Sequence, residues 1–189
     1  RGLGDVYKRQ ALTHRQSTKR ITSVKIVVVN YNSGTRLSNC LRSLLQTVLD
    51  LKSQLDITVS VIDNNSEDQS AKRVEPLFSH LSEFHFIFSE KNLGFAGAIN
   101  LAGKSSTSDA LLVLNPDVEI SAETIKHLTQ ALDSQIELGA VTPVFKDRAG
   151  NVQYGFCARS LPTLGSTLAE LFYLHRAWKN NPWTTRLEL

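Results

Sequence analysis

The chain has 189 residues and a mass of 21.0 kDa, with 41% hydrophobic and 21% charged residues, 10 Gly, 5 Pro and 2 Cys. This length suits one globular domain that buries about 70% of its unfolded surface, and the composition excludes a disordered chain, a collagen-like repeat and a disulfide scaffold. The formal net charge is +3, but residues 1–20 carry six basic side chains against Asp5, a net +5, whereas 15 basic and 17 acidic side chains leave the rest at −2. The net charge of −2 after residue 20 excludes a basic nucleic-acid-binding domain.

Residues 1–20 lack hydrophobic periodicity and are poor in large apolar side chains. They predict a disordered basic tail, with a basic docking arm as the alternative. The first ten residues, RGLGDVYKRQ, resemble translated adapter sequence, and the chain contains no methionine. We therefore expect residues 1–20 to be a tail or a sequence scar outside the fold, and the chain to be part of a longer reading frame.

No apolar run reaches the roughly 20 residues of a membrane span. Cys40 lies among helical apolar positions and Cys157 is distant in sequence, so both are expected to be reduced packing residues. A cytoplasmic protein is the expectation.

From residue 21 onward, short buried strands alternate with amphipathic helices. Strands are predicted at residues 25–29, 57–62, 84–88, 110–114 and 140–145. Helices are predicted from the apolar stripes over 37–48, 74–81, 96–102 and 125–136. Ser66 with Gln69 predicts a capping box before the second helix, and Ser121 predicts the cap of the fourth. This alternation predicts a mostly parallel α/β sheet flanked by helices, with right-handed crossovers.

Polar clusters follow four of these strands directly, at 30–32, 63–65, 91–94 and 115–117. The carboxyl ends of parallel strands meet at one edge of the sheet, which is where open α/β sheets bind ligands. Ordinary turn and cap formation is the alternative, and for residues 64–66 it is the favoured one. In Asn115-Pro116-Asp117 a carboxylate follows a buried strand on a stiff loop and would share Mg²⁺ or Mn²⁺ with a diphosphate, whereas a simple turn is the equal alternative.

Four stretches in this order and spacing resemble the family 2 glycosyltransferases of the GT-A fold, and in particular their rhamnosyltransferase-like branch. They are VVVNYNSGTRLSNCLRSL, VSVIDNNSEDQS, NLGFAGAINLA and LLVLNPDVEI. The resemblance covers about residues 24–155. It implies a GT-A-like, Rossmann-like sheet, truncated at the C-terminus, in which residues 21–155 form the half that binds a nucleotide sugar.

The resemblance also implies roles for individual residues. Asn30, Tyr31 and Asn32 would form one wall of the nucleoside pocket, and Asp63 would hydrogen-bond the base or ribose of the donor. The loop near the nucleotide would be shaped by Asn92, Gly94 and Gly97. Asn115 and Asp117 would occupy the metal motif, which begins with Asn here rather than Asp, so that Asp117 alone contacts the metal.

The resemblance implies a catalytic Glu-Asp pair that these residues do not supply. The only adjacent pair, Glu67-Asp68, is interpreted as acidic residues at a helix start. We therefore expect the general base beyond Leu189, and residues 156–189 to be an incomplete helical extension toward an acceptor half. A peripheral contact of this extension with the membrane is the less favoured alternative.

The resulting expectation is a glycosyltransferase that moves a sugar, rhamnose being one candidate, from a dTDP- or UDP-linked donor to a glycan or lipid-linked hydroxyl acceptor, with inversion. The fragment itself would lack activity because the base is missing. A non-catalytic module that binds nucleotide sugars is the alternative. A phosphoacceptor receiver domain is disfavoured because residues 30–32 lack the acidic pair that it needs after its first strand.

Overall fold

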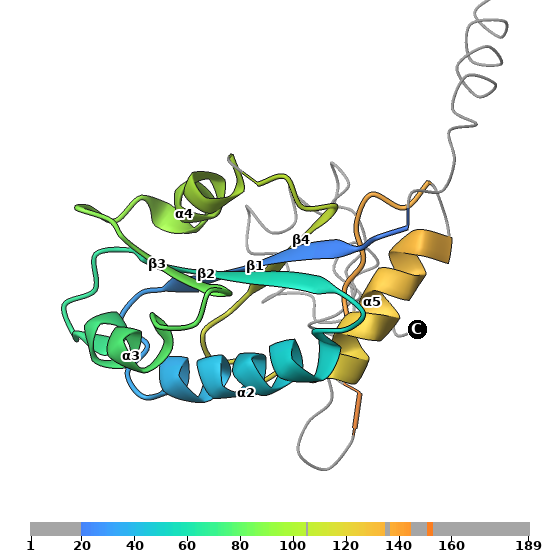
Figure 1. The fold of residues 1–189 in the computed structure, drawn as a ribbon. Helices are drawn as coiled ribbons and strands as arrows, with labels where there is room; N and C mark the ends of the chain where they lie inside the picture. Colours follow the sequence, from blue (N-terminus) through green and yellow to red (C-terminus); the bar gives the residue numbers. More distant parts are fainter. Residues whose placement is uncertain (1–19, 105, 135–136, 145–150, 153–189) are drawn as a thin grey trace, which may run out of the picture. The chain divides into compact units, whose positions relative to one another are not determined.

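The computed structural model describes residues 20–104, 106–134, 137–144 and 151–152 (Figure 1). Within these ranges four strands form one sheet in the order β3-β2-β1-β4, and all three neighbouring pairs are parallel. The strands are Ser23–Asn30 (β1), Asp56–Asp63 (β2), Phe84–Phe88 (β3) and Ala110–Leu114 (β4). The helices are Arg36–Leu51 (α2), Ser70–Phe78 (α3), Gly94–Gly103 (α4) and Ala122–Ser134 (α5). The predicted α/β architecture is confirmed.

The strand order explains which helices cover which face of the sheet. From β1 the chain steps outward to β2 and then β3, and it returns past both to reach β4 on the other side of β1. Because right-handed crossovers place the helix on opposite faces for opposite directions of travel, α2 and α3 share one face and α4 lies on the other (Figure 1). Helix α5 packs beside α2.

The core consists of two layers that share the central strand β1. Ile26 and Val28 pack with the apolar faces of α2, α3 and α5, whereas Val27 and Val29 pack with Ala98 beneath α4. Residues 26–28 are completely buried, which explains the unbroken apolar run in the sequence. Each such side chain contributes about 1.5–3 kcal/mol relative to an exposed one.

Two details of the predicted elements are wrong. Residues 140–144 form no strand, and Pro143 supplies the reason because it has no N–H to donate to a neighbouring strand. The Ser66–Gln69 capping box does not form, since α3 begins at Ser70 after Gln69 in the left-handed conformation, without a side-chain cap. The Ser121 cap is confirmed, because the hydroxyl of Ser121 accepts a hydrogen bond from the Thr124 N–H at 3.3 Å.

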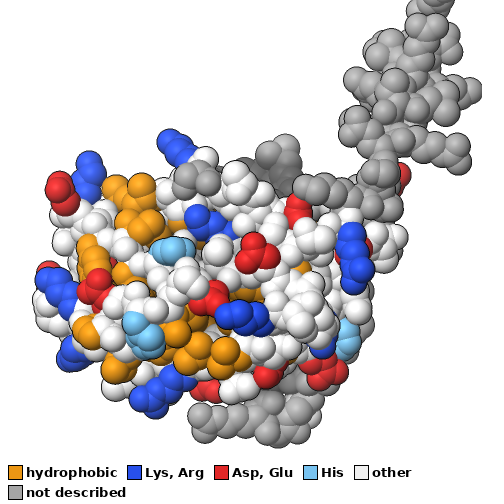
Figure 2. Space-filling view, in the orientation of Figure 1, with side chains coloured by type: hydrophobic (Ala, Val, Ile, Leu, Met, Phe, Trp, Pro, Cys, Tyr) orange, Lys and Arg blue, Asp and Glu red, His pale blue; other side chains and the backbone are white. Residues whose placement is uncertain are grey.

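The chain divides into two compact units, Arg1–Gly139 and Ala140–Leu189, and all four strands belong to the first. The predicted tail up to residue 19 and the predicted extension at 156–189 lie outside the described residues and stay predictions. In the part of the chain that the structure describes, no helix combines the length and the hydrophobicity that a membrane span requires. On the face shown in Figure 2, basic and acidic side chains are interspersed.

Candidate functional site

The loops after β1, β2 and β4 leave the sheet at the same edge. Asn30 at the end of β1 pairs with Asp63 at the end of β2, and Val28 pairs with Leu114 at the end of β4. Because neighbouring strands lie about 4.8 Å apart, the ends of β2 and β4 are separated by about 10 Å, with β1 between them. The predicted convergence of these loops on one edge is therefore present.

A hollow of about 240 Å³ opens at this edge, between the loop after β1 and the loop after β4. Its lining consists of Tyr31, Asn32, Ser33, Arg36, Asn115, Pro116 and Asp117. The structure thus joins two of the predicted clusters in one concavity. Asp63 does not line it and lies on the far side of β1.

Four side chains of this hollow have no hydrogen-bond partner among the residues that the structure describes. Tyr31 is 51% exposed, and Asn115, Asp117 and Arg36 are also exposed. Within the described part of the chain, none of these four side chains makes a hydrogen bond or an ion pair. A phenol, an amide, a carboxylate and a guanidinium are therefore available to a ligand.

Asn30, in contrast, is completely buried at the centre of a hydrogen-bond network. Its Nδ2 lies 2.7 Å from Asp63 Oδ1, 2.9 Å from Ser70 Oγ and 3.0 Å from Ser66 Oγ, so three oxygens share its two N–H groups. Its Oδ1 accepts a hydrogen bond from the Ser33 hydroxyl. The side chain of Asn30 therefore fixes the loops after β1 and β2 to each other.

Asn32 strengthens the same junction. Its Oδ1 accepts hydrogen bonds from the backbone N–H groups of Glu67 at 2.9 Å and Asp68 at 3.3 Å, and its own N–H donates to Ser66 Oγ at 3.1 Å. Asp68 Oδ2 in turn accepts from the Gly34 N–H at 2.8 Å. The Asp68 side chain thus has a structural use, as expected of a non-catalytic pair. The placement of the pair in the helix start is wrong, because Glu67 and Asp68 precede α3 and its first turn has no acidic residue.

Hydrogen bonds also set the pKa of Asp68. Desolvation raises it, but the hydrogen bonds from Ser70 and from the Gly34 N–H, together with the charge of Arg73, outweigh desolvation and lower the pKa below 3.8. The ionised carboxylate is therefore the form that holds the loop.

The loop after β3 is tied to the loop after β2. Asn64 is buried, donates through Nδ2 to Asn92 Oδ1 at 2.9 Å and accepts the Leu93 N–H at 2.8 Å. Asn64 was expected to be a turn or cap former, and its side chain instead connects two loops. Gly94 has a φ of +71°, which favours glycine, whereas Gly97 lies inside α4 rather than in the loop.

Beneath the loop after β4 lies the thiol of Cys40. Burial, followed by the negative charges of Asp117 and Glu119, raises the pKa of Cys40 from 9.0 to about 12. Cys40 Sγ donates a weak hydrogen bond to the Asn115 carbonyl oxygen at 3.8 Å. This thiol is thus a protonated packing residue, as predicted, and supports the loop that carries Asp117.

The residues of the hollow suit a divalent cation only in combination with a ligand. Within the described ranges there is no group of three or more His, Cys, Asp or Glu side chains that could hold a metal ion. Asp117 offers one free carboxylate and Asn115 one amide oxygen, which are hard oxygen donors. Mg²⁺ accepts one or two carboxylates when phosphate and water fill the remaining positions, so these residues fit a cation that arrives with a phosphorylated ligand.

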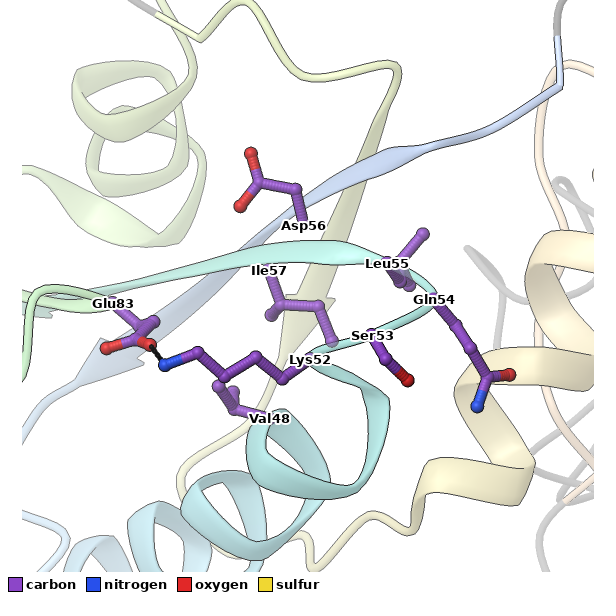
Figure 3. Close-up of a pocket in the computed structure, with 8 residues that line it drawn as sticks. All are labelled: Val48, Lys52, Ser53, Gln54, Leu55, Asp56, Ile57 and Glu83. Atoms are coloured by element: carbon purple, nitrogen blue, oxygen red, sulfur yellow. Dashed lines mark hydrogen bonds and ion pairs between the residues drawn. The ribbon is translucent and has the colours of Figure 1, made fainter.

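A second, larger hollow of about 360 Å³ lies at the opposite, amino edge of the sheet (Figure 3). Lys52 and Glu83 form an ion pair of 3.1 Å across it, but Lys52 is 68% exposed, so the pair contributes little stability. Loops at the carboxyl edge, rather than size, mark ligand sites in such sheets. We therefore take the smaller hollow as the candidate site.

Sequence reasoning missed two residues of the site, Arg36 and Ser33. Arg36 begins α2, four residues after the polar cluster at 30–32, and this position at the carboxyl edge of the sheet is a signal that could have found it. Ser33 carries no such signal, because its contact with Asn30 depends on the fold of the turn.

The family model for glycosyl transferase family 2 matches residues 25–184. An N-acetylglucosaminyl-diphospho-decaprenol L-rhamnosyltransferase of Mycobacterium tuberculosis is 28% identical over 173 residues, which are 85% of this chain and 52% of the relative. A low-salt glycan biosynthesis hexosyltransferase, Agl10 of Haloferax volcanii, is 28% identical over 134 residues, 69% of this chain and 39% of the relative.

Among solved structures, S. aureus TarS 1-349 shares the fold with a TM-score of 0.50 at 22% identity, over 70% of this chain and 43% of that one. Its complex with UDP-GlcNAc has the same TM-score at 24% identity, over 67% and 39%. The present chain spans about half the length of the M. tuberculosis relative, 52%. With a family model that covers most of its length, the chain belongs to glycosyl transferase family 2.

Proposed function

We propose that the hollow binds the diphosphate part of a nucleotide-sugar donor, and that the protein from which this chain comes transfers the sugar to a hydroxyl acceptor in envelope glycan synthesis. The observation that carries the proposal is the free Asp117 carboxylate beside Asn115, at the carboxyl edge of the sheet in a family 2 chain. The M. tuberculosis relative is named an L-rhamnosyltransferase, so a rhamnose donor is the first sugar to test.

The chemistry assigned to the site is a single displacement with inversion. The acceptor oxygen bonds to the anomeric carbon as the bond from that carbon to the diphosphate breaks, and the diphosphate leaves with the electron pair. A general base takes the acceptor proton, and we place that base beyond Leu189. Mg²⁺ or Mn²⁺ held by Asp117 would supply positive charge near the leaving diphosphate.

The chain's own residues bind and orient the donor in this proposal. The Tyr31 ring and the backbone of residues 30–32 form one wall for the nucleoside. Asp63 hydrogen-bonds the base or ribose. Asn92 and Gly94 shape the neighbouring loop, with Gly97 supporting it from α4. Asn30 acts as a positioning residue, because its side-chain amide is hydrogen-bonded to other residues of the protein.

The test is calorimetric titration of the full chain with UDP and with dTDP, each with Mn²⁺ and with EDTA. We expect binding that Mn²⁺ strengthens, and we expect Asp117→Asn to remove this strengthening, a loss of about tenfold or 1.4 kcal/mol. Asp56→Asn is the matched control, since Asp56 is exposed at the amino edge of the sheet. A folded chain that binds neither nucleotide contradicts the proposal.

A binding module without transferase activity is the second candidate. It is favoured by the structural use of Asp68, which leaves no adjacent Glu-Asp pair free within the described ranges. An assay for nucleoside diphosphate release with the full reading frame, a dTDP- or UDP-linked sugar and a lipid-linked acceptor separates the two. Donor binding without release supports the module, and acceptor-dependent release supports the transferase.

A further inference from the structure

Among the described residues that line the candidate hollow, only Arg36 has a cationic side chain. It begins α2, on the wall formed by the chain after β1, whereas Asp117 lies on the wall formed by the chain after β4. Its guanidinium makes no hydrogen bond or ion pair to the described part of the protein. A free guanidinium in a concavity is available for an anion.

The charges of the hollow explain why a diphosphate needs this residue. A nucleoside diphosphate carries at least two negative charges at neutral pH, and the Asp117 carboxylate alone would repel it. The two charged residues share one hollow of about 240 Å³. The described residues contain no ion pair between Arg36 and Asp117, so the N–H donors of the guanidinium are not taken up by that carboxylate.

The chemistry of arginine suits the task. The planar guanidinium offers five N–H donors and pairs with two oxygens of a phosphate at once. Because arginine stays protonated at every accessible pH, this attraction needs no metal.

We propose that Arg36 binds the diphosphate of the donor from the wall opposite Asp117, so that part of the affinity is independent of the divalent cation. The inference rests on the proposed function and adds to it a residue for diphosphate recognition. It predicts that the anion is held between a guanidinium on one side and a cation on Asp117 on the other.

The experiment titrates the full chain and its Arg36→Gln variant with UDP and with uridine, each in EDTA and in Mn²⁺. We expect Arg36→Gln to weaken UDP binding about five- to tenfold in both conditions and to leave uridine binding unchanged. Arg36→Lys should recover part of the lost affinity for UDP, because lysine restores the positive charge but cannot pair with two phosphate oxygens as the planar guanidinium does.

Arg42→Gln is the matched control. Arg42 lies on the same helix, is exposed and does not line the hollow, so its substitution changes the net charge equally. It should leave UDP binding within about twofold of the unmodified chain, and both glutamine variants should keep the melting temperature.

Two results would overturn the inference while leaving the proposed function intact. One is UDP binding by Arg36→Gln equal to that of the unmodified chain. The other is an equal loss for UDP and uridine, which indicates a disturbed pocket rather than a lost phosphate contact. If the unmodified chain binds no nucleotide in either condition, the proposed function fails, and this inference fails with it.

Discussion

Asn30→Ala tests the buried network that connects the loops after β1 and β2. The substitution removes the two N–H groups of Nδ2, which three oxygens share, one of them a carboxylate oxygen of Asp63 at 2.7 Å, and it leaves the Ser33 hydroxyl without its acceptor. A hydrogen bond to a charged group contributes about 1.5–3 kcal/mol and each neutral one about 1 kcal/mol. The free energy of unfolding should therefore fall by about 3–5 kcal/mol, a large share of the 5–15 kcal/mol that is typical of a domain.

Urea and thermal unfolding of the full chain measure this loss, which corresponds to a fall of roughly 6–20 °C in melting temperature for a chain of this size. Asn39→Ala is the control, because Asn39 is exposed on α2 and alanine is the better helix former. It should leave stability unchanged or raise it slightly. In the double variant Asn30→Ala/Asp63→Ala, the loss should be smaller than the sum of the single losses, since the two residues share one interaction. The reasoning is refuted if Asn30→Ala costs less than about 1 kcal/mol.

The lowered pKa of Asp68 means that its contribution to stability is present above pH 3.8 and is lost as the pH falls through the lower folded value, so acid unfolding of Asp68→Asn should depend less steeply on pH than that of the parent chain. An acid-unfolding slope of Asp68→Asn equal to that of the parent chain would contradict the assignment. Gly94→Ala should lower stability by about 1–2 kcal/mol, because φ is +71° there although nothing lies within 4 Å of an added Cβ. Gly103→Ala, where an added Cβ would meet Leu111 at an ordinary 3.9 Å, should be neutral or stabilising by up to about 1 kcal/mol, and the same sign for both would argue against a backbone cause. With its pKa raised to about 12, the thiol of Cys40 should resist a disulfide reagent at pH 8 until the chain is unfolded, as measured in a Cys157→Ser background; prompt labelling of the folded protein would exclude the buried position.

Hydrophobic periodicity predicted the strands well because the strands of this sheet are short and strongly apolar. The bounds 84–88 and 110–114 agree with the structure, and β1 and β2 extend the predicted ranges by one or two residues at each end. The pattern failed at 140–144, where an apolar run contains Pro143. Hydrophobic periodicity reflects side chains only, and it takes no account of the backbone N–H that Pro143 lacks. For this reason the apolar run at 140–144 resembled a fifth strand.

The start of α3 was mispredicted for a related reason. Ser66 and Gln69 have the spacing of a capping box, but Ser66 Oγ is already occupied by Asn30 and by the N–H of Asn32. These partners come from a different strand end, 36 and 34 residues away in sequence. Local spacing cannot reveal such a competitor. The competing contacts of Ser66 can be recognised only in the folded structure, where the parallel register of β1 and β2 places Asn30 beside Asp63.

The polar residues at this edge of the sheet divide into two groups according to whether their side chains are hydrogen-bonded within the described structure. Those of the first group, around Asn30 and Asn64, are buried and bonded to one another, as buried polar groups must be. Those of the second group, including Asp117 and Arg36, line the hollow, and their side chains make no hydrogen bond or ion pair with the described residues. Asp63 belongs to the first group by its 7% exposure, and Asn30 and the Ser66 N–H occupy part of its carboxylate. A carboxylate accepts about four hydrogen bonds, so Asp63 retains capacity for a nucleotide. Its substitution would nevertheless disturb folding and binding together, whereas Asp117 and Arg36 can be changed without breaking a described side-chain contact, and they are therefore the residues on which the assignment of the site is best decided.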